Sequence, residues 1–303
     1  MTESPLSGRR AHTMAELGEL HSRTMPREFA EQSMAAYQPR STDIIISPAG
    51  KCGTTMLQQL FHTLRTGGDM EFDDISRVVP WIETAKALDL DINAEQVATP
   101  RGFKSHLAWG PMPKGARYIV ALRDPKDALV SMYRFMEGWY LEPGTVTLDT
   151  FIEAQLGARG HGRDHWAHLV SWWQQRDNPD VLLLSYEHIV ADKALAIRRV
   201  AEFCDLRLDA GLLERTLHHT SREFMLEHKD RFNDAMMRAI SESRGGLPSG
   251  SDSAKVRANA GQPRRDELSA ERLAEFDAIW QSDVAEHINL PDFAALEADL
   301  RRR

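Results

Sequence analysis

Residues 43–55 of this 303-residue chain read Asp-Ile-Ile-Ile-Ser-Pro-Ala-Gly-Lys-Cys-Gly-Thr-Thr, a short apolar run followed by a polar turn. An apolar run of this length favours a strand that is buried on both faces, as in a parallel sheet. The apolar periodicity from Thr54 to about Arg65 favours a helix directly after the turn. The stretch therefore predicts a strand, a tight turn and a helix in succession.

Two later segments repeat this pattern, beginning with the apolar runs Tyr118–Leu122 and Val181–Ser185. Each run is followed by a polar turn and a helix-like stretch: the turns are Arg123–Asp127 and Tyr186–Asp192, and the helices run to about Met136 and over Lys193–Cys204. Such alternation predicts an α/β fold with a central parallel sheet flanked by helices. Ligands bind beyond the carboxyl ends of the strands in these sheets, so we expect the three turns to form one site.

The remaining segments are expected to belong to the same single domain, which spans residues 1–303. Residues 1–40 are expected to add helices ahead of the first strand. Residues 245–261 are rich in Gly, Ser, Asp and Ala, which predicts a mobile lid loop. Helical periodicity resumes over Leu268–Trp280, with Ser269 as the expected helix cap.

Composition excludes several functional classes. A formal net charge of −8 argues against a nucleic-acid binder or an anionic-membrane binder. Cys52 and Cys204 are too few for a disulfide scaffold. Met1–Met25 lacks the apolar core of a signal peptide, and no stretch approaches the roughly 20 apolar residues of a membrane span. We therefore expect a cytoplasmic protein with small-molecule partners, whose oligomeric state the sequence leaves open.

The turn after the first apolar run has the composition of an anion-binding loop. Gly53 lets the backbone approach an anion closely, and the N-terminus of the following helix presents free N–H groups. Lys51 adds a full positive charge, and Thr54 and Thr55 supply hydroxyl donors. The turn therefore predicts a site for a phosphate or a similar anion.

Two other chemistries fit this turn less well. A Walker A loop has its lysine directly after the last glycine, whereas Lys51 precedes Gly53. Cys52 as a phosphatase nucleophile would need an arginine six residues later, and that position is Gln58. A magnesium-dependent nucleotide enzyme is therefore the weaker reading, and a cysteine phosphatase is excluded.

Residues 47–56, Ser-Pro-Ala-Gly-Lys-Cys-Gly-Thr-Thr-Met, resemble the 5′-phosphosulfate loop of the cytosolic sulfotransferase family, whose usual form is YPKSGTTW. The family residues are matched at Lys51, Gly53, Thr54 and Thr55, while Cys52 replaces a serine and Met56 replaces the tryptophan that stacks on adenine. The resemblance implies that all six residues bind 3′-phosphoadenosine 5′-phosphosulfate (PAPS).

Arg123-Asp-Pro-Lys-Asp-Ala-Leu-Val-Ser131 resembles the family's 3′-phosphate segment, R-[ND]-P-[KR]-D-x-x-x-S. The resemblance implies that Arg123 and Ser131 bind the 3′-phosphate of the donor. The forked guanidinium of Arg123 suits that role, and Pro125 suits a first helical turn. In a Walker B reading, Asp124 would instead be a metal ligand.

Lys104-Ser-His106 precedes the second apolar run and resembles the family's KTH motif. The resemblance implies that His106 is the general base towards the acceptor hydroxyl. An imidazole titrates near neutrality, which suits removal of that proton. Lys104 is expected to stabilise charge on the transferring group.

Three further segments carry a weaker resemblance and imply further donor contacts. Tyr186 is similar to the family's tyrosine beside adenine. Thr220 stands in a segment like the family's T-S-F, in which Arg222 replaces the phenylalanine. Arg257 stands within Lys255–Gly261, which partly matches the C-terminal R-K-G-x-x-G signature. The helical spacing of His161, His165 and His168 lacks a completing ligand, so we expect no metal site.

Together these motifs predict a P-loop-like sulfotransferase fold and a PAPS-dependent sulfotransferase. The acceptor is expected to be a hydroxyl of a small molecule or glycolipid, and no segment identifies it further. Two alternatives stay open. One is a magnesium-dependent nucleotide kinase or NTPase of related fold with Asp124 essential, and the other is a catalytically inactive nucleotide-binding protein.

Overall fold

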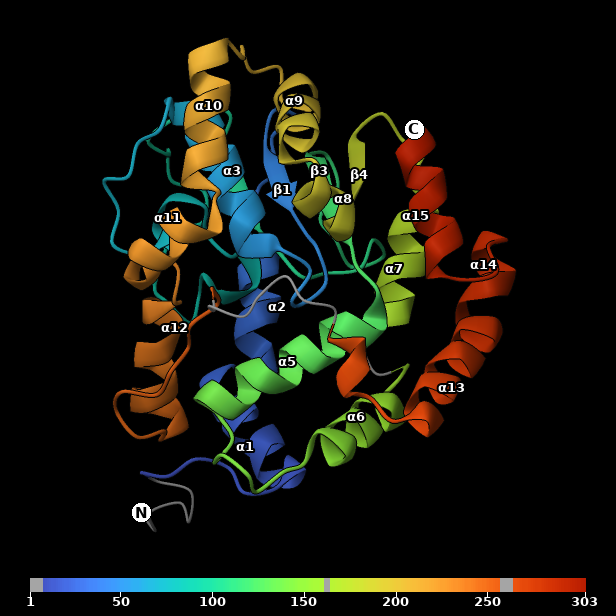
Figure 1. Cartoon of the computed structure of the whole chain (residues 1–303). Helices are drawn as coiled ribbons and strands as arrows, with labels where there is room; N and C mark the ends of the chain where they lie inside the picture. The colour runs from blue at the N-terminus through green and yellow to red at the C-terminus, as the bar shows by residue number, and fades with distance from the viewer. Residues whose placement is uncertain (1–7, 161–163, 257–263) are drawn as a thin grey trace.

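The computed structural model describes residues 8–160, 164–256 and 264–303, and its centre is a parallel sheet of four strands in the order β2-β1-β3-β4 (Figure 1). The strands are β1 (Ile44–Ile46), β2 (Gly102–Lys104), β3 (Arg117–Leu122) and β4 (Val181–Ser185). The three predicted strands and their parallel pairing are confirmed. Strand β2 was not predicted, because three residues ending in a lysine form no apolar run.

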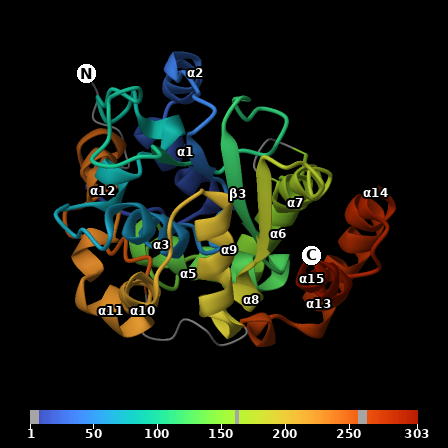
Figure 2. The ribbon, with the colours of Figure 1, turned by 90° about the horizontal axis from the view of Figure 1, so that it is seen from above.

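Apolar side chains cover both faces of this sheet, which explains the continuous apolar runs. Ile44, Ile119 and Leu182 face one core cluster, whereas their neighbours Ile45, Val120 and Leu183 face the other. The first cluster is covered by α3 (Thr54–Thr66), α9 (Lys193–Phe203) and α10 (Ala210–His219). Figure 2 shows α9 on one side of β3 and β4 and α7 (His165–Trp173) on the other. The fold is thus doubly wound, as predicted.

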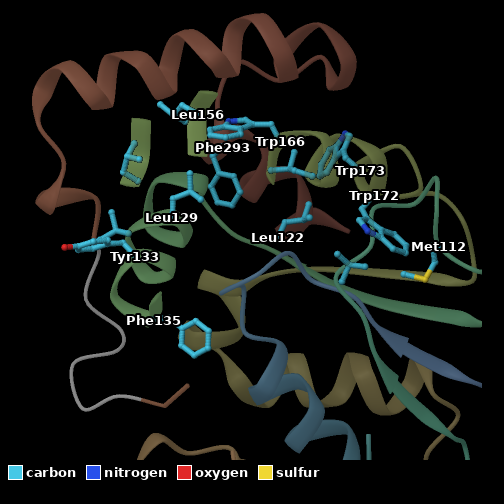
Figure 3. Close-up of a cluster of buried hydrophobic side chains, with 14 of the residues drawn as sticks. Met112, Leu122, Leu129, Tyr133, Phe135, Leu156, Trp166, Trp172, Trp173 and Phe293 are labelled. Atoms are coloured by element: carbon cyan, nitrogen blue, oxygen red, sulfur yellow. The ribbon is translucent and has the colours of Figure 1, made fainter. Parts of the chain in front are cut away.

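The second cluster holds most of the tryptophans (Figure 3). Trp166, Trp172 and Trp173 project from α7 into this cluster, and the Trp172 ring packs against Tyr118 near the start of β3. The cluster is closed by α5 (Pro125–Trp139), α6 (Leu148–Gly157), α13 (Ala270–Ile279) and α15 (Phe293–Arg302). These rings are buried core residues, so they support the sheet and are not free to line an acceptor pocket.

The remaining elements surround this core. They are α1 (Met14–Thr24), α2 (Arg27–Ala36), α4 (Ile75–Val78), α8 (Tyr186–Ala191), α11 (Arg222–Glu227), α12 (Ala235–Ile240) and α14 (Glu286–Ile288), with 3₁₀ turns at Ile82–Thr84, Lys229–Arg231 and Arg265–Glu267 and π-helical turns at Ser241–Gly245 and Trp280–Ala285. Within residues 8–40, the described part of the N-terminal segment, the helices are α1 and α2. In the described part of 245–261, neither helix nor strand follows Gly245. No helix in the described ranges has the length and apolarity needed to cross a membrane.

Local caps explain where the helices begin. Asp124 caps α5 by accepting a hydrogen bond from Lys126 N, and Ser269 caps α13 as predicted. The stretch Tyr186–Asp192 was predicted as a turn, and this is wrong, because it contains the helix α8. The hydroxyl of Ser185 accepts a hydrogen bond from His188 N at 3.3 Å and thereby starts that helix one residue after β4.

Candidate active site

The polar turns that follow β1, β3 and β4 meet at the carboxyl edge of the sheet. Arg123, after β3, donates from Nη1 to the carbonyl oxygen of Lys51 at 2.7 Å. Its guanidinium carbon lies 4.3 Å from the ring centroid of Tyr186, after β4. The same ring lies against Gly53, where an added Cβ would come within 2.8 Å of it. Three sequence-predicted segments are therefore in direct contact.

The loop after β1 has a backbone suited to an anion. Lys51 and Gly53 both adopt left-handed conformations, with φ of 66° and 86°. Alternation of this kind turns successive N–H groups towards one point. Gly53 begins α3 without a side-chain cap, and the buried Thr54 Oγ1 has no hydrogen-bond partner among the described residues. A helix N-terminus with an unused hydroxyl fits a phosphate group.

Helix α5 packs over this loop. A Cβ on Gly50 would come within 2.5 Å of the Met132 methyl group, so the helix approaches the backbone closely. The Lys51 ammonium lies 4.2 Å from the ring centroid of Phe135. Cys52 is buried against Ala128, and burial raises the pKa of its thiol to about 12. The thiol is therefore neutral at neutral pH, in keeping with the exclusion of a cysteine nucleophile.

Arg123 is buried but is paired with neither Asp124 nor Asp127. Those two carboxylates bind Arg265, at 3.1 Å and 2.6 Å. Asp124 also caps α5, so both of its contacts in the described residues are structural. Arg123 Nε has no hydrogen-bond partner within the described ranges and lies 4.0 Å from Glu187 Oε1. Burial raises the pKa of Glu187 to about 7, and the nearby Glu297 adds to this.

The other predicted donor contacts, Ser131, Met56, Thr220 and Arg257, have different surroundings. Ser131 lies half-buried on α5, and the Met56 methyl lies 3.5 Å from where a Cβ on Gly53 would stand. The Thr220 hydroxyl is buried and donates to Thr216 O at 2.7 Å, so it is satisfied within its own helix. Arg257 lies outside the described residues.

His106 lies on the other side of the loop, two residues after β2. Its Nδ1 lies 2.7 Å from the carbonyl oxygen of Pro48, which must accept a hydrogen bond from Nδ1–H. This leaves the lone pair on Nε2. The backbone N of His106 donates to Glu83 Oε1 at 2.8 Å. Burial, and then the charge of Lys104, lower the pKa of His106 well below its ordinary value, so its imidazole is neutral.

Lys104 ends β2 and is almost completely buried. Its ammonium lies 3.9 Å from the ring centroid of Trp81 and 3.9 Å from Asp234 Oδ2. Lys255 pairs with the same carboxylate oxygen. Burial lowers the pKa of Lys104 to about 7, although the Asp234 charge opposes this. Sequence reasoning missed Asp234, which stands in no recognised motif, and it did not assign a role to Lys255, although that residue begins the segment matched to the C-terminal signature.

Two of the three spaced histidines support the loop. His168 Nε2 lies 3.1 Å from Ser47 O, and burial lowers the pKa of His168 to about 3. His165 Nε2 lies 3.8 Å from Cys52 Sγ, and burial lowers its pKa to about 4. His161 falls outside the described residues. Within those ranges, no group of three or more His, Cys, Asp or Glu side chains could hold a metal ion.

Known proteins with similar sequences are sulfotransferases. The chain is 25% identical to luciferin sulfotransferase of Photinus pyralis over 292 residues, which covers 84% of this chain and 75% of the relative. It is 29% identical to sulfotransferase 1B1 of Mus musculus over 204 residues, covering 63% and 68% of the two chains.

Solved structures agree on the fold. Retinol dehydratase in a complex with retinol and PAP superimposes with a TM-score of 0.67 at 19% identity, covering 91% of this chain and 96% of that one. A mouse sulfotransferase complexed with PAP gives 0.66 at 18% identity, covering 92% and 95%. The P-loop-like sulfotransferase fold is thereby confirmed.

The family model described as "Sulfotransferase domain" matches residues 41–288, from just before β1 to the end of α14. This span includes the loop after β1, Arg123, His106 and the two lysines that flank Asp234. The family match covers most of the chain, and the fold agrees with it. The chain therefore belongs to the sulfotransferase domain family.

Proposed function

We propose that this protein transfers a sulfuryl group from PAPS to a hydroxyl of a small-molecule acceptor, with His106 as general base. The observation that carries the proposal is the contact between the loop after β1 and Arg123, which sets two anion-binding groups side by side. PAPS carries phosphate at both its 5′ and 3′ positions, so it needs two such groups. The PAP bound in the related structures supports this donor.

The 5′-phosphosulfate is assigned to the loop. The N–H groups at the start of α3 and the unused Thr54 hydroxyl would hold its oxygens. Lys51 supplies positive charge for the bridging oxygen, which becomes negative as its bond to sulfur breaks. Arg123 would hold the 3′-phosphate through its forked guanidinium. Ser131, half-buried on α5, is the second residue assigned to that phosphate.

His106 is oriented to accept the acceptor proton. Its Nδ1–H donates to Pro48 O, so the basic Nε2 remains for the hydroxyl. In the proposed step the acceptor oxygen forms a bond to sulfur while the bond from sulfur to the bridging phosphate oxygen breaks. The hydroxyl proton passes to Nε2, and the products are a sulfate ester and PAP.

The environment of His106 favours an apolar acceptor. The Trp81 ring packs against the imidazole edge-on, with 5.2 Å between ring centroids, and is itself partly exposed. An aromatic wall beside the base suits an alcohol or phenol on an apolar body. Luciferin sulfotransferase and the retinol complex of retinol dehydratase carry names that agree with such acceptors.

Calorimetry with PAP and ATP tests the donor assignment. PAP should bind without added magnesium and more tightly than ATP, because only PAP offers a 3′-phosphate to Arg123. Equal affinity for the two, or ATP binding that requires Mg²⁺ and Asp124, would instead support the nucleotide kinase or NTPase reading.

Transfer itself is tested with labelled PAPS and a cell extract. Mass spectrometry should detect a metabolite that gains the labelled sulfate only when enzyme is present, and this would also identify the acceptor. PAP binding with no labelled product from the extract or from a panel of alcohols, phenols and glycolipids would favour the inactive nucleotide-binding protein.

A further inference from the structure

One buried carboxylate behind His106 faces two lysines. Asp234 is 4% exposed, and its Oδ2 lies 3.9 Å from the Lys104 ammonium and closer still to that of Lys255. Its Oδ1 accepts from the Ser76 hydroxyl at 3.4 Å. Burying a carboxylate is costly unless it is paired, so this arrangement depends on both cations.

The backbone aims this carboxylate at the lysines. Asp234 adopts a left-handed conformation with φ of 51°, immediately before α12. Asp74 fixes the start of α12, because its Oδ2 accepts from Met236 N at 3.2 Å. Asparagine and aspartate adopt the left-handed region more readily than most residues, so the amide can replace the acid here without altering the turn.

The charge state of Lys104 depends on its neighbours. Burial lowers its pKa to about 7; Asp234 and, more weakly, Asp74 raise it, whereas Lys255 lowers it further. Burial also disfavours the charged form of Asp234, but the two lysine charges outweigh this and hold the pKa of Asp234 below its usual range. After burial, the charge of Lys104 is in turn the largest cause that lowers the pKa of His106.

A single ring connects this cluster to the proposed base. The Lys104 ammonium lies 3.9 Å from the Trp81 ring centroid, and the His106 ring packs against the same indole. Along the chain, a single residue, Ser105, separates Lys104 from His106. Any change in the Lys104 charge is therefore felt at the imidazole across a short, water-poor path.

We propose that Asp234 is a positioning residue of the sulfuryl-transfer site, holding the Lys104 and Lys255 ammonium groups in place and charged beside His106. This inference rests on the proposed function. The two cations disfavour protonation of the imidazole before the acceptor binds, and they offset the negative charge of the transferring group. Asp234 touches neither substrate nor donor in this scheme and acts only through the lysines.

Asp234→Asn is the central test, because it removes the charge and keeps the left-handed turn. We expect kcat to fall about tenfold, equivalent to about one pKa unit in the Lys104 equilibrium, while the Kd for PAP stays unchanged. Glu227→Gln is the matched control: it neutralises an exposed acid on the neighbouring helix α11 and should leave kcat unchanged.

A titration of the donor-free protein separates an electrostatic role from a merely structural one. The lysine Cε signals can be followed by NMR in protein with labelled lysine, with Lys104 assigned through Lys104→Arg. Asp234→Asn should lower the Lys104 midpoint, whereas Lys255→Gln should raise it, because that variant removes a repelling charge. If both variants move the midpoint in the same direction, or neither moves it, the proposal is wrong.

The double variant Asp234→Asn with Lys255→Gln removes one negative and one positive charge together. Its Lys104 midpoint and its kcat should both recover towards the wild-type values, which would show coupling between the two positions. Failure of the proposed function is recognised separately, since the wild-type protein would then transfer no sulfate from PAPS. Wild-type kcat in Asp234→Asn, measured in an active enzyme, would overturn only the role of Asp234.

Discussion

The donor region and the histidine region share one edge of the sheet but differ in how their polar groups are paired. The donor region comprises residues 47–55 with Arg123, and the histidine region comprises Trp81, Glu83, Lys104, His106, Asp234 and Lys255. In the first, Thr54 Oγ1 and Arg123 Nε lack partners in the described part of the chain. In the second, Trp81 Nε1 and Glu83 Oε2 also lack partners among the described residues, but the groups proposed for catalysis, His106 Nδ1 and the two lysines, are bonded within the protein.

This difference has an energetic consequence. An unpaired buried donor is costly until a ligand satisfies it, so the donor region is suited to binding. Ionisable groups that are already paired, such as His106 and the two lysines, contribute little to binding, but their partners control their charge and orientation. Substitutions in the donor region should therefore change affinity, and those in the histidine region should change turnover.

The largest expected effect is at the base. His106→Ala should lower kcat by about 10²–10⁴-fold, because proton removal by a positioned base contributes roughly that factor. Its Kd for PAP should match that of the wild type, since in the surroundings described above the imidazole bonds only to Pro48 O, and the bond to Glu83 comes from the backbone N of residue 106. A fully active variant, measured by sulfate transfer from labelled PAPS, would remove His106 from the mechanism.

Arg123→Ala should have the next largest effect, on affinity. We expect PAP to bind about 10–100-fold more weakly, since hydrogen bonds to charged groups contribute about 1.5–3 kcal/mol each. Adenosine 5′-phosphate, which differs from PAP only in lacking the 3′-phosphate, is the matched ligand and should lose little. Equal losses for the two ligands in calorimetry would show that Arg123 supports the loop through Lys51 O rather than binding the 3′-phosphate.

Thr54→Val should weaken PAP binding without weakening the fold, so the two effects of one substitution can be told apart. Removing a buried hydroxyl that lacks a partner should leave the free energy of unfolding unchanged or raise it by about 1 kcal/mol. The same change should weaken PAP binding about fivefold, because one donor to the 5′-phosphate is lost. Thermal unfolding and calorimetry on one sample decide this; weaker folding together with unchanged binding would contradict it.

The smallest expected effect concerns pH. Burial raises the pKa of Glu187 to about 7, so the carboxyl is neutral below that pH and charged above it. Once charged, it attracts the Arg123 guanidinium, 4.0 Å away, and competes with the 3′-phosphate. PAP affinity should therefore fall a few-fold between about pH 6 and pH 8 in the wild type.

Glu187→Gln is the comparison for that measurement. It should bind PAP with less pH dependence than the wild type, and the phosphate groups of PAP titrate identically in both experiments. Parallel affinity curves for the two proteins would show that Glu187 does not act on the donor region.

Elements that follow a local rule were predicted from the sequence. The apolar runs marked β1, β3 and β4, and Pro125 marked the start of α5. Strand β2 was not predicted, because it is only three residues long and is defined by its backbone pairing with β1. Helix α8 was not predicted, because its start depends on a single cap at Ser185.

The site divides in the same way. Lys51, Gly53, Arg123 and Tyr186 stand at strand ends, so parallel topology alone brings them together. Asp234 meets Lys104 only because distant segments fold over one another, and no spacing rule anticipates that contact. All the donor contacts and catalytic roles assigned from the sequence stay predictions, including those of Ser131, Thr220 and Arg257.

The close approach of Gly53 to the Tyr186 ring has a consequence for selectivity. The Tyr186 ring contacts both Gly53 and the Arg123 guanidinium, and Arg123 also donates to the carbonyl oxygen of Lys51, so the ring and this hydrogen bond together fix the guanidinium against the loop. For the proposed donor with two phosphates, these contacts determine where the two phosphate-binding groups lie relative to one another. In the proposed complex, an isomer with its second phosphate on the 2′-oxygen would present that group to the guanidinium at a different distance from the 5′-phosphate.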